Sequence, residues 1–280
     1  MIGAIVQARM GSTRLPGKTM MDLDGMSTLA RVVTRLEKSK YIDKVIVATT
    51  TNEEDDVILE ETKRLGCLCY RGKSEDVLDR VTRAALTKDA TTIVEITADC
   101  PLIHHSVVDP VIEAFKEYRP DIATNFIPQT YPKGYEVRVF GITRLKRLNE
   151  IVDNPVDRQH VSTALFWNPQ TKGNYTVHNV EAPPESTRPE LAVTLDTPED
   201  LEMIRKVFAI ARETNLDLTP ENVCMLFNLY PFLYNDVAKV VRKDYLTELK
   251  EYWASPEYKR KERARNAPKD SPRKVRARKK

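Results

Sequence analysis

Residues 2–18 read IGAIVQARMGSTRLPGK, and this stretch decides the fold. Its apolar half, Ala4 to Val6, predicts a buried β-strand, and a loop with three cations and two glycines follows at once. Glycine lets the backbone approach a ligand closely, while backbone N–H groups and fixed cations suit a polyphosphate. A solvated basic turn without a ligand is the alternative, but the position directly after the first strand favours phosphate binding. The candidate ligands in this loop are Arg9, Gly11, Ser12, Arg14 and Lys18.

Around this stretch the hydrophobic pattern alternates between strands and helices. That order predicts an α/β protein whose mostly parallel sheet carries helices on both faces. In such sheets ligands bind at the carboxyl ends of the strands. Strands are expected at 44–49, 92–97, 136–140, 174–180 and 191–195, and helices at 28–38, 53–65, 76–86, 107–118 and 198–212.

The composition is that of a globular protein with one unusual end. The 280 residues are 41% hydrophobic and 30% charged, with neither a membrane-spanning run nor a recognisable signal peptide, so we expect a cytoplasmic protein. The four cysteines lack CxxC spacing, which indicates reduced thiols rather than a zinc site. The net charge of +3 hides an asymmetry: residues 259–280 hold twelve Lys or Arg against two acids, a net of +10, which leaves −7 for residues 1–258.

Two aspartates follow predicted strands directly. Asp99 comes after the strand at 92–97, and Asp196 comes after the one at 191–195. Each could instead cap the helix that follows it, but two carboxylates at strand ends beside a cationic loop predict a site for Mg²⁺ and a nucleoside triphosphate. Because such carboxylates repel each other in an empty site, neutralising one is expected to leave stability nearly unchanged.

Five segments together resemble a known family. They are QARMGSTRLPGK (7–18), TADCPLI (97–103), TYPKGYEVRVF (130–140), RQHV (158–161) and LDTPEDLEMI (195–204). They occur in the same order in the bacterial and archaeal cytidylyltransferases, above all in the SpsF-like group of spore coat polysaccharide biosynthesis proteins, which is related to the enzymes that activate 3-deoxy-manno-octulosonate and acylneuraminate. The resemblance covers about residues 1–230. It implies a Rossmann-like nucleotide-diphospho-sugar transferase fold and a Mg²⁺-dependent transfer of CMP from CTP with release of pyrophosphate.

The resemblance also implies roles for individual residues. Arg9, Arg14 and Lys18 would be the catalytic cations on the triphosphate, Gly11 and Ser12 would contact phosphate through their amides, and Ala8 would lie under the base. Asp79 and Arg80 would flank the base, although a surface salt bridge is an alternative for them. Asp99 and Asp196 would bind Mg²⁺, and Glu136, Arg138, Arg158 and His160 would face the acceptor.

The acceptor region departs from the usual family pattern, which reads approximately PDGLDVEVF and REHV. Lys133 stands where Asp is common, Arg138 where Glu is common, and His104 where Asp follows PLI. Glu136 for Asp and Gln159 for Glu are milder changes. The added positive charge predicts an anionic acceptor, either an anionic sugar or a phosphorylated small molecule. His160 could contact it or be satisfied inside a helix start.

The chain is therefore expected to contain a nucleotidyltransferase domain (1–230), a helical extension (231–258) and a disordered basic tail (259–280). The tail composition suits electrostatic attachment to anionic membrane lipid or nucleic acid, or no partner at all. The expected enzyme serves surface polysaccharide or glycoconjugate biosynthesis, with a homodimer as an open alternative for its assembly. Two other functions remain open: a nucleotidyltransferase with another base specificity, and a nucleotide- or nucleic-acid-binding protein that acts through its tail.

Overall fold

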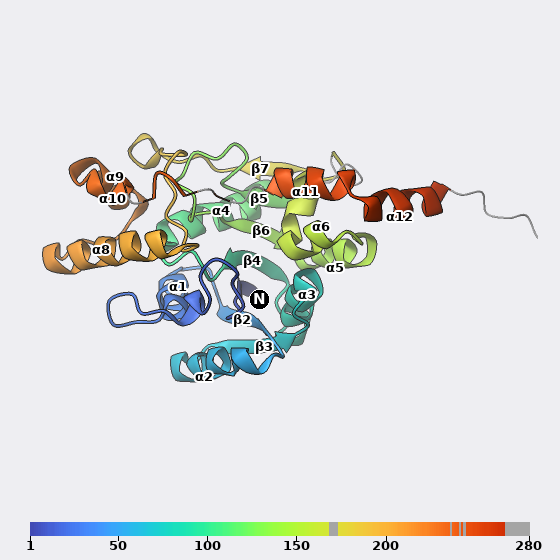
Figure 1. The fold of residues 1–280 in the computed structure, drawn as a ribbon, viewed down its shortest axis with the longest axis horizontal. Coiled ribbons are helices and arrows are strands. Elements are labelled where there is room, and N and C mark those ends of the chain that lie inside the picture. Colours follow the sequence, from blue (N-terminus) through green and yellow to red (C-terminus); the bar gives the residue numbers. More distant parts are fainter. Residues whose placement is uncertain (168–172, 236, 241, 243–244, 267–280) are drawn as a thin grey trace, which may run out of the picture. The chain divides into compact units, whose positions relative to one another are not determined.

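A seven-stranded sheet in the order β3-β2-β1-β4-β6-β5-β7 organises the computed structural model (Figure 1). The structure describes residues 1–167, 173–235, 237–240, 242 and 245–266. Residues 1–241 and 242–280 form two units. The first unit extends beyond the predicted boundary at 230 because Leu233 and Val237 join its hydrophobic core. The strands are β1 (Ile2–Gln7), β2 (Lys44–Thr50), β3 (Leu68–Gly72), β4 (Thr92–Thr97), β5 (Ile122–Thr124), β6 (Arg138–Gly141) and β7 (Val177–Asn179).

The strand that precedes the cationic loop at residues 9–18 lies in the interior of the sheet. β1 pairs in parallel with β2 on one side and with β4 on the other, and Val6 lies opposite both Val47 and Ile96. The carboxyl ends of these strands therefore meet at one edge. β2 with β3 and β5 with β7 are parallel as well, and only β6 runs antiparallel to its neighbours β4 and β5. The predicted mostly parallel α/β sheet is therefore confirmed. The helices of the first unit are α1 (Thr28–Leu36), α2 (Asp56–Leu65), α3 (Val77–Thr87), α4 (His105–Tyr118), α5 (Ile142–Ile151), α6 (Pro155–His160), α7 (Ala164–Trp167), α8 (Pro198–Thr214), α9 (Pro220–Leu229) and α10 (Phe232–Asn235).

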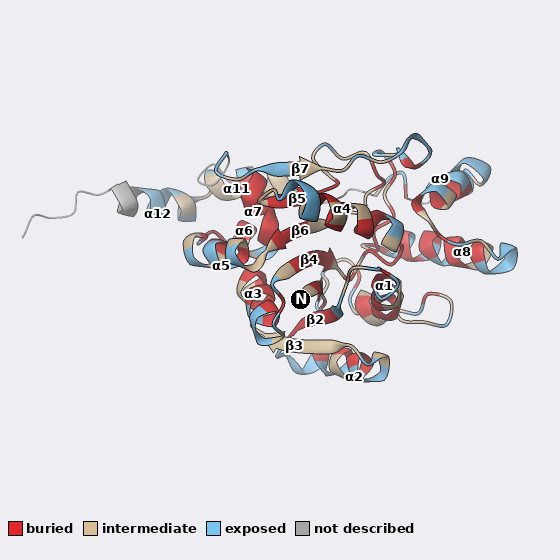
Figure 2. Cartoon of the chain, turned by 180° about the vertical axis from the view of Figure 1, so that it is seen from behind, coloured by how far each residue is buried: buried red, intermediate tan, exposed pale blue. Residues whose placement is uncertain are grey.

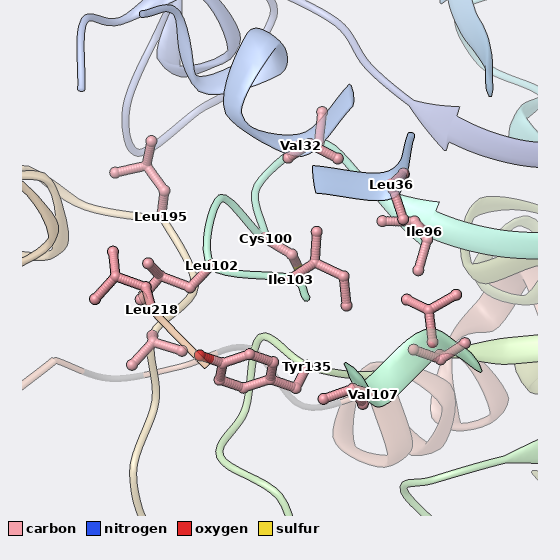
Figure 3. Close-up of a cluster of buried hydrophobic side chains, with 14 of the residues drawn as sticks. Val32, Leu36, Ile96, Cys100, Leu102, Ile103, Val107, Tyr135, Leu195 and Leu218 are labelled. Atoms are coloured by element: carbon pink, nitrogen blue, oxygen red, sulfur yellow. The ribbon is translucent and has the colours of Figure 1, made fainter. Parts of the chain in front are cut away.

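Both faces of the sheet are buried, as predicted. Ala4 and Val6 of β1 point into a core shared with α1, α4 and α8, while Ile5 points into a second core shared with α3 and α5. Figure 2 shows buried residues on both sides of the strands, and Figure 3 shows part of the first core, where the ring of Tyr135 lies among aliphatic side chains. Helices on both faces explain why these strands are continuously apolar rather than alternating.

Residues 191–195 do not form the expected strand. Their backbone bonds go to two different loops instead of one neighbouring strand: Val193 N–H donates to Lys133 O at 2.7 Å, and Leu195 N–H donates to Asp99 O at 2.8 Å. Only an isolated bridge between Lys133 and Ala192 results. The sequence analysis also missed β3 and β5, because both are short and neither stands out as an apolar run.

The second unit contains α11 (Tyr245–Ala254) and α12 (Pro256–Asn266). Residues 259–266, expected to be disordered, therefore lie in a helix. Lys, Arg, Glu and Ala favour helix, and Glu257 pairs with Lys261 one turn later at 2.8 Å. Residues 267–280 of the tail lie outside the described residues. Among the described helices, none has both the length and the apolar character needed to cross a membrane.

Candidate active site

The loop after β1 is held in place by its own backbone and by one aspartate. Met10 N–H donates to Asp55 Oδ1 at 2.7 Å, while Met10 O accepts from the N–H groups of Ser12 and Gly17 at 2.8 and 3.0 Å. Gly17 adopts a left-handed conformation with φ 74°, which a side chain would disfavour, and a 3₁₀ turn (Lys18–Met20) begins immediately after it. This turn fixes the direction in which Lys18 leaves the backbone.

Lys18 connects the loop to both predicted metal ligands. Its Nζ donates to Asp99 Oδ2 at 2.8 Å, to Asp196 Oδ1 at 2.9 Å and to Leu195 O at 2.9 Å. Arg14 also reaches Asp196 Oδ1 at 3.2 Å. Burial of Lys18 acts to lower its pKa, but the two carboxylates outweigh it and raise the pKa above the ordinary value. Lys18 is therefore a fully charged ammonium at neutral pH.

Neither aspartate is a helix cap. Thr197 caps α8 through a reciprocal capping box with Asp200, and His104 caps α4 by accepting from Ser106 N–H. Asp99 and Asp196 are brought together by the backbone bond from Leu195 N–H to Asp99 O, which joins the segment after β4 to the segment before α8. Thr97 Oγ1 donates to Asp99 Oδ1 at 2.6 Å and orients that carboxylate.

The expectation that the two carboxylates repel each other in the empty site is wrong, because Lys18 lies between them. Replacing either aspartate by asparagine removes one partner of a partly buried ammonium. We therefore expect each replacement to lower stability rather than leave it unchanged. The carboxylate oxygens of these two residues are hard ligands of the kind that Mg²⁺ prefers. Mg²⁺ usually completes its coordination with phosphate and water. In the described part of the chain, no group of three or more His, Cys, Asp or Glu residues could hold a metal by itself.

His104 does not add the positive charge that the sequence analysis assigned to it. Its imidazole is buried, and Nδ1 accepts from Ser106 N–H at 3.2 Å, which requires that nitrogen to be unprotonated. Burial, together with the nearby His105 and Arg35, lowers its pKa from the usual 6.5 to about 4, although Asp217 acts in the opposite direction. His104 is thus neutral at pH 7.

This depressed pKa predicts a loss of stability in acid. The unfolded state takes up a proton near pH 6.5 and the folded state only near pH 4, so the stabilisation is present above pH 6.5 and is lost as the pH falls through that range. We expect the loss attributable to this residue to be about 2–3 kcal/mol by pH 4. Urea unfolding of the wild type and of His104→Asn, which keeps a helix cap but does not titrate, measures the difference at pH 7 and pH 4. Equal losses in both proteins would contradict the assignment.

The two residues predicted to flank the base have different surroundings. Arg80 is buried, with NH1 donating to Lys73 O at 2.7 Å, and a Cβ on Gly72 would lie 2.9 Å from Arg80 Cγ. Burial, with a further contribution from Arg9, lowers its pKa to about 10. The Asp79 carboxylate instead accepts hydrogen bonds from Arg83 at 2.8 Å and from Asn149 at 3.2 Å. It therefore forms the surface salt bridge that the sequence offered as the alternative to base binding.

Arg138 and Glu136, both predicted at the acceptor, have partners of different kinds. Arg138 lies across from Glu95 in the ladder between β6 and β4, 4.0 Å from its carboxylate and 4.5 Å over the ring of Phe126. Gln7 donates to the same Glu95 oxygen at 3.0 Å, and burial raises the pKa of this carboxyl group. Glu136 accepts from Gly134 N–H at 2.7 Å and so stabilises its own turn. Glu95 was not among the predicted site residues, although a charged residue inside the apolar strand TIVEIT already indicates a buried polar contact.

His160 and Arg158 lie on α6. The His160 carbonyl accepts from Thr163 Oγ1 at 3.0 Å, where the chain leaves the helix. Arg158 binds Asp76 through Nε and NH2 at 3.0 and 2.7 Å and also donates to Asn149 and to Val152 O. These contacts join α6 to α5 and to the start of α3, which indicates a structural role for Arg158.

Replacing Arg158 should therefore affect stability more than turnover. We expect Arg158→Met to lower the free energy of unfolding by about 1.5–3 kcal/mol, the usual worth of hydrogen bonds to charged groups. Turnover per folded molecule and the KM for the acceptor should stay close to wild type. Urea unfolding and steady-state kinetics on the same preparations measure both quantities. A raised acceptor KM with unchanged stability would instead show that Arg158 binds substrate.

Comparison with known proteins identifies the family of this chain. Residues 3–223 match the family model described as cytidylyltransferase. The chain is 29% identical over 231 residues to the spore coat polysaccharide biosynthesis protein SpsF of Bacillus subtilis, covering 81% of this chain and 94% of that one. It is 34% identical over 116 residues to a 3-deoxy-manno-octulosonate cytidylyltransferase of Anaeromyxobacter dehalogenans, which covers 40% of this chain and 46% of that one.

A solved structure shows the same fold along most of the chain. The cytidylyltransferase from Leptospira borgpetersenii superposes with a TM-score of 0.74 at 27% identity, covering 87% of this chain and 99% of that one. The sheet and the cationic cluster at its carboxyl edge thus define a nucleotidyltransferase. The chain belongs to the cytidylyltransferase family.

Proposed function

We propose that this protein transfers CMP from CTP to an anionic sugar or phosphorylated small-molecule acceptor in a Mg²⁺-dependent reaction that releases pyrophosphate. The observation that carries the proposal is the convergence of Arg14 and Lys18 on Asp99 and Asp196 at the carboxyl edge of the sheet. SpsF and the octulosonate enzyme, the relatives named above, support a role in surface polysaccharide or glycoconjugate biosynthesis.

The proposed reaction needs no covalent intermediate on the protein. An acceptor oxygen attacks the α-phosphorus of CTP in line; one P–O bond forms while the bond to the departing pyrophosphate breaks. Arg9, Arg14 and Lys18 neutralise the negative charge that grows in the transition state, which is where such sites gain most of their rate. Bound Mg²⁺, held by Asp99 and Asp196, would supply further neutralisation of this charge. The Arg9 side chain is exposed and makes no hydrogen bond within the described residues, so it is available to the triphosphate.

The base would lie beside the end of β1, where Ala8 N–H is fixed by Ala48 O at 3.2 Å. Arg80 is the side chain we assign to this subsite, since its Nε is buried without a partner among the described residues and its charge interacts with that of Arg9.

The fate of a labelled phosphate in CTP tests the reaction class. With α-labelled CTP the label should move to the acceptor, and with γ-labelled CTP it should appear only in pyrophosphate. Transfer of the γ label to the acceptor would identify a kinase instead.

The basic tail is proposed to attach the enzyme to anionic lipid without contributing to catalysis. Its net charge of +10 on residues 259–280 attracts such a surface, and pathways that build surface glycans end at membranes. A chain ending at residue 258 should keep full turnover but lose cosedimentation with anionic liposomes. Binding by the full chain should weaken with salt, because the Debye length falls from about 10 Å at 0.1 M to about 3 Å at 1 M. Binding that survives the truncation, or that prefers RNA, would contradict this role.

A further inference from the structure

We propose that Lys18 closes the metal site of the free protein, so that the divalent cation enters only with the nucleotide. The inference rests on the proposed function, because it takes Asp99 and Asp196 as the metal ligands. Lys18 Nζ lies 2.8 Å from Asp99 Oδ2 and 2.9 Å from Asp196 Oδ1. An ammonium group and a divalent cation cannot both occupy the space between the same two oxygens, since their charges repel at such distances.

The remaining carboxylate oxygens are engaged as well. Asp99 Oδ1 accepts from Thr97 Oγ1 at 2.6 Å, and Asp196 Oδ2 accepts from Thr194 Oγ1 at 3.4 Å. Arg14 adds a second cation at 3.2 Å from Asp196 Oδ1. The side chains of Lys18 and Asp196 are only 15% and 16% exposed, so water screens this cluster weakly. A free metal ion must therefore displace Lys18 from its charged partners before it can bind.

A triphosphate provides the means of displacement. The backbone of Lys18 is fixed by its N–H bond to Leu15 O at 3.2 Å and by the turn after Gly17, whereas its four-carbon side chain can rotate. Phosphate oxygens compete with the carboxylates for Lys18 and Arg14. Once these cations move to the nucleotide, the oxygens of Asp99 and Asp196 are uncovered for the metal. Nucleotide and metal should consequently raise each other's affinity, and by linkage the factor is the same in both directions.

Metal binding without turnover tests the proposal. Mn²⁺ is titrated into metal-free protein and followed by electron paramagnetic resonance, with no acceptor present. We expect weak binding by the wild type and binding tighter by at least about tenfold in Lys18→Met and Lys18→Gln, because a positive charge a few ångströms from the metal has been removed. Lys18→Arg keeps the charge and should stay weak. Lys40→Met is the matched control: it removes a lysine that pairs with exposed Glu113 before β2 begins, at the opposite edge of the sheet.

Adding α,β-methylene CTP gives a second measurement. The nucleotide should raise the Mn²⁺ affinity of the wild type by a larger factor than that of Lys18→Met, since the variant has no ammonium to displace. Thermal unfolding identifies folded variants, and Mn²⁺ should raise the Tm of Lys18→Met more than that of the wild type. Equal Mn²⁺ affinity in wild type, Lys18→Met and Lys18→Gln would overturn the proposal. A protein that fails to turn over CTP yet shows the tenfold difference would refute the proposed reaction and leave the role of Lys18 standing.

Discussion

Asp99→Asn and Asp196→Asn should each lower the rate of pyrophosphate release from CTP by at least about 10²–10³-fold, the loss seen when one preorganised charge-stabilising group is removed from an active site. Both carboxylates lie within 3 Å of Lys18 Nζ, and we assign the metal to them. Asparagine keeps the shape of the side chain but removes the negative charge that a hard divalent cation requires. A coupled pyrophosphate assay at saturating CTP measures the loss.

The same two variants should also be less stable in the absence of metal and nucleotide. Each loses one charge-assisted hydrogen bond from Lys18, which is worth about 1.5–3 kcal/mol. Asp121→Asn is the matched control, because Asp121 pairs with Arg144 next to β5, at the edge of the sheet away from the site. It should keep its turnover. If Asp99→Asn or Asp196→Asn retains near wild-type turnover, that residue does not belong to the active site.

Lys18→Met should lower kcat by about 10²–10³-fold, equivalent to 2.7–4 kcal/mol of transition-state stabilisation. Lys18 carries the most tightly held charge of the loop, and in the proposed reaction that charge moves onto the triphosphate as negative charge develops. Because the interaction strengthens in the transition state, kcat should fall more than KM for CTP rises. Steady-state kinetics over a range of CTP concentrations separate the two parameters.

Lys18→Arg is the informative companion variant. Arginine keeps the charge but replaces a compact ammonium by a planar guanidinium, which cannot reach three acceptors in the geometry that Lys18 uses. We expect partial activity, between wild type and Lys18→Met. A Lys18→Met enzyme within about tenfold of wild type would show that Lys18 contributes only to ground-state binding, since a tenfold change corresponds to only 1.4 kcal/mol.

A simple rule of sheet geometry predicts that the loop after β1 and the segments after the later strands lie close together. Lys18, Asp99 and Asp196 are far apart in the chain, yet strands that run in parallel end at one edge, and residues placed just after them meet there. The segment at 191–195 reaches that edge without being a strand, because its amide hydrogens bond to the Asp99 and Lys133 loops. The prediction for Asp196 therefore rested on an incorrect strand, although the structure still places this residue beside Lys18.

Other residues depend on contacts that no local pattern contains. The partner of Arg158 is Asp76, and that of Arg138 is Glu95; both pairs join elements that are distant in sequence. The charge of His104 depends on its burial and on the nearby Arg35, neither of which its position in the sequence reveals. Counting cations among the departures from the family pattern thus overestimated the added positive charge, since His104 is neutral and Arg138 has a carboxylate partner in Glu95.

The most direct test of the proposed function is pyrophosphate release from each of the four ribonucleoside triphosphates, measured with a panel of anionic sugars and sugar phosphates that includes 3-deoxy-manno-octulosonate. The reactions contain Mg²⁺, with EDTA-treated controls and with Asp99→Asn as the inactive control. We expect release that requires CTP, Mg²⁺ and at least one anionic acceptor. Equal or faster release with ATP, GTP or UTP would contradict the assignment of CTP, and release that is independent of Asp99 would contradict the site itself.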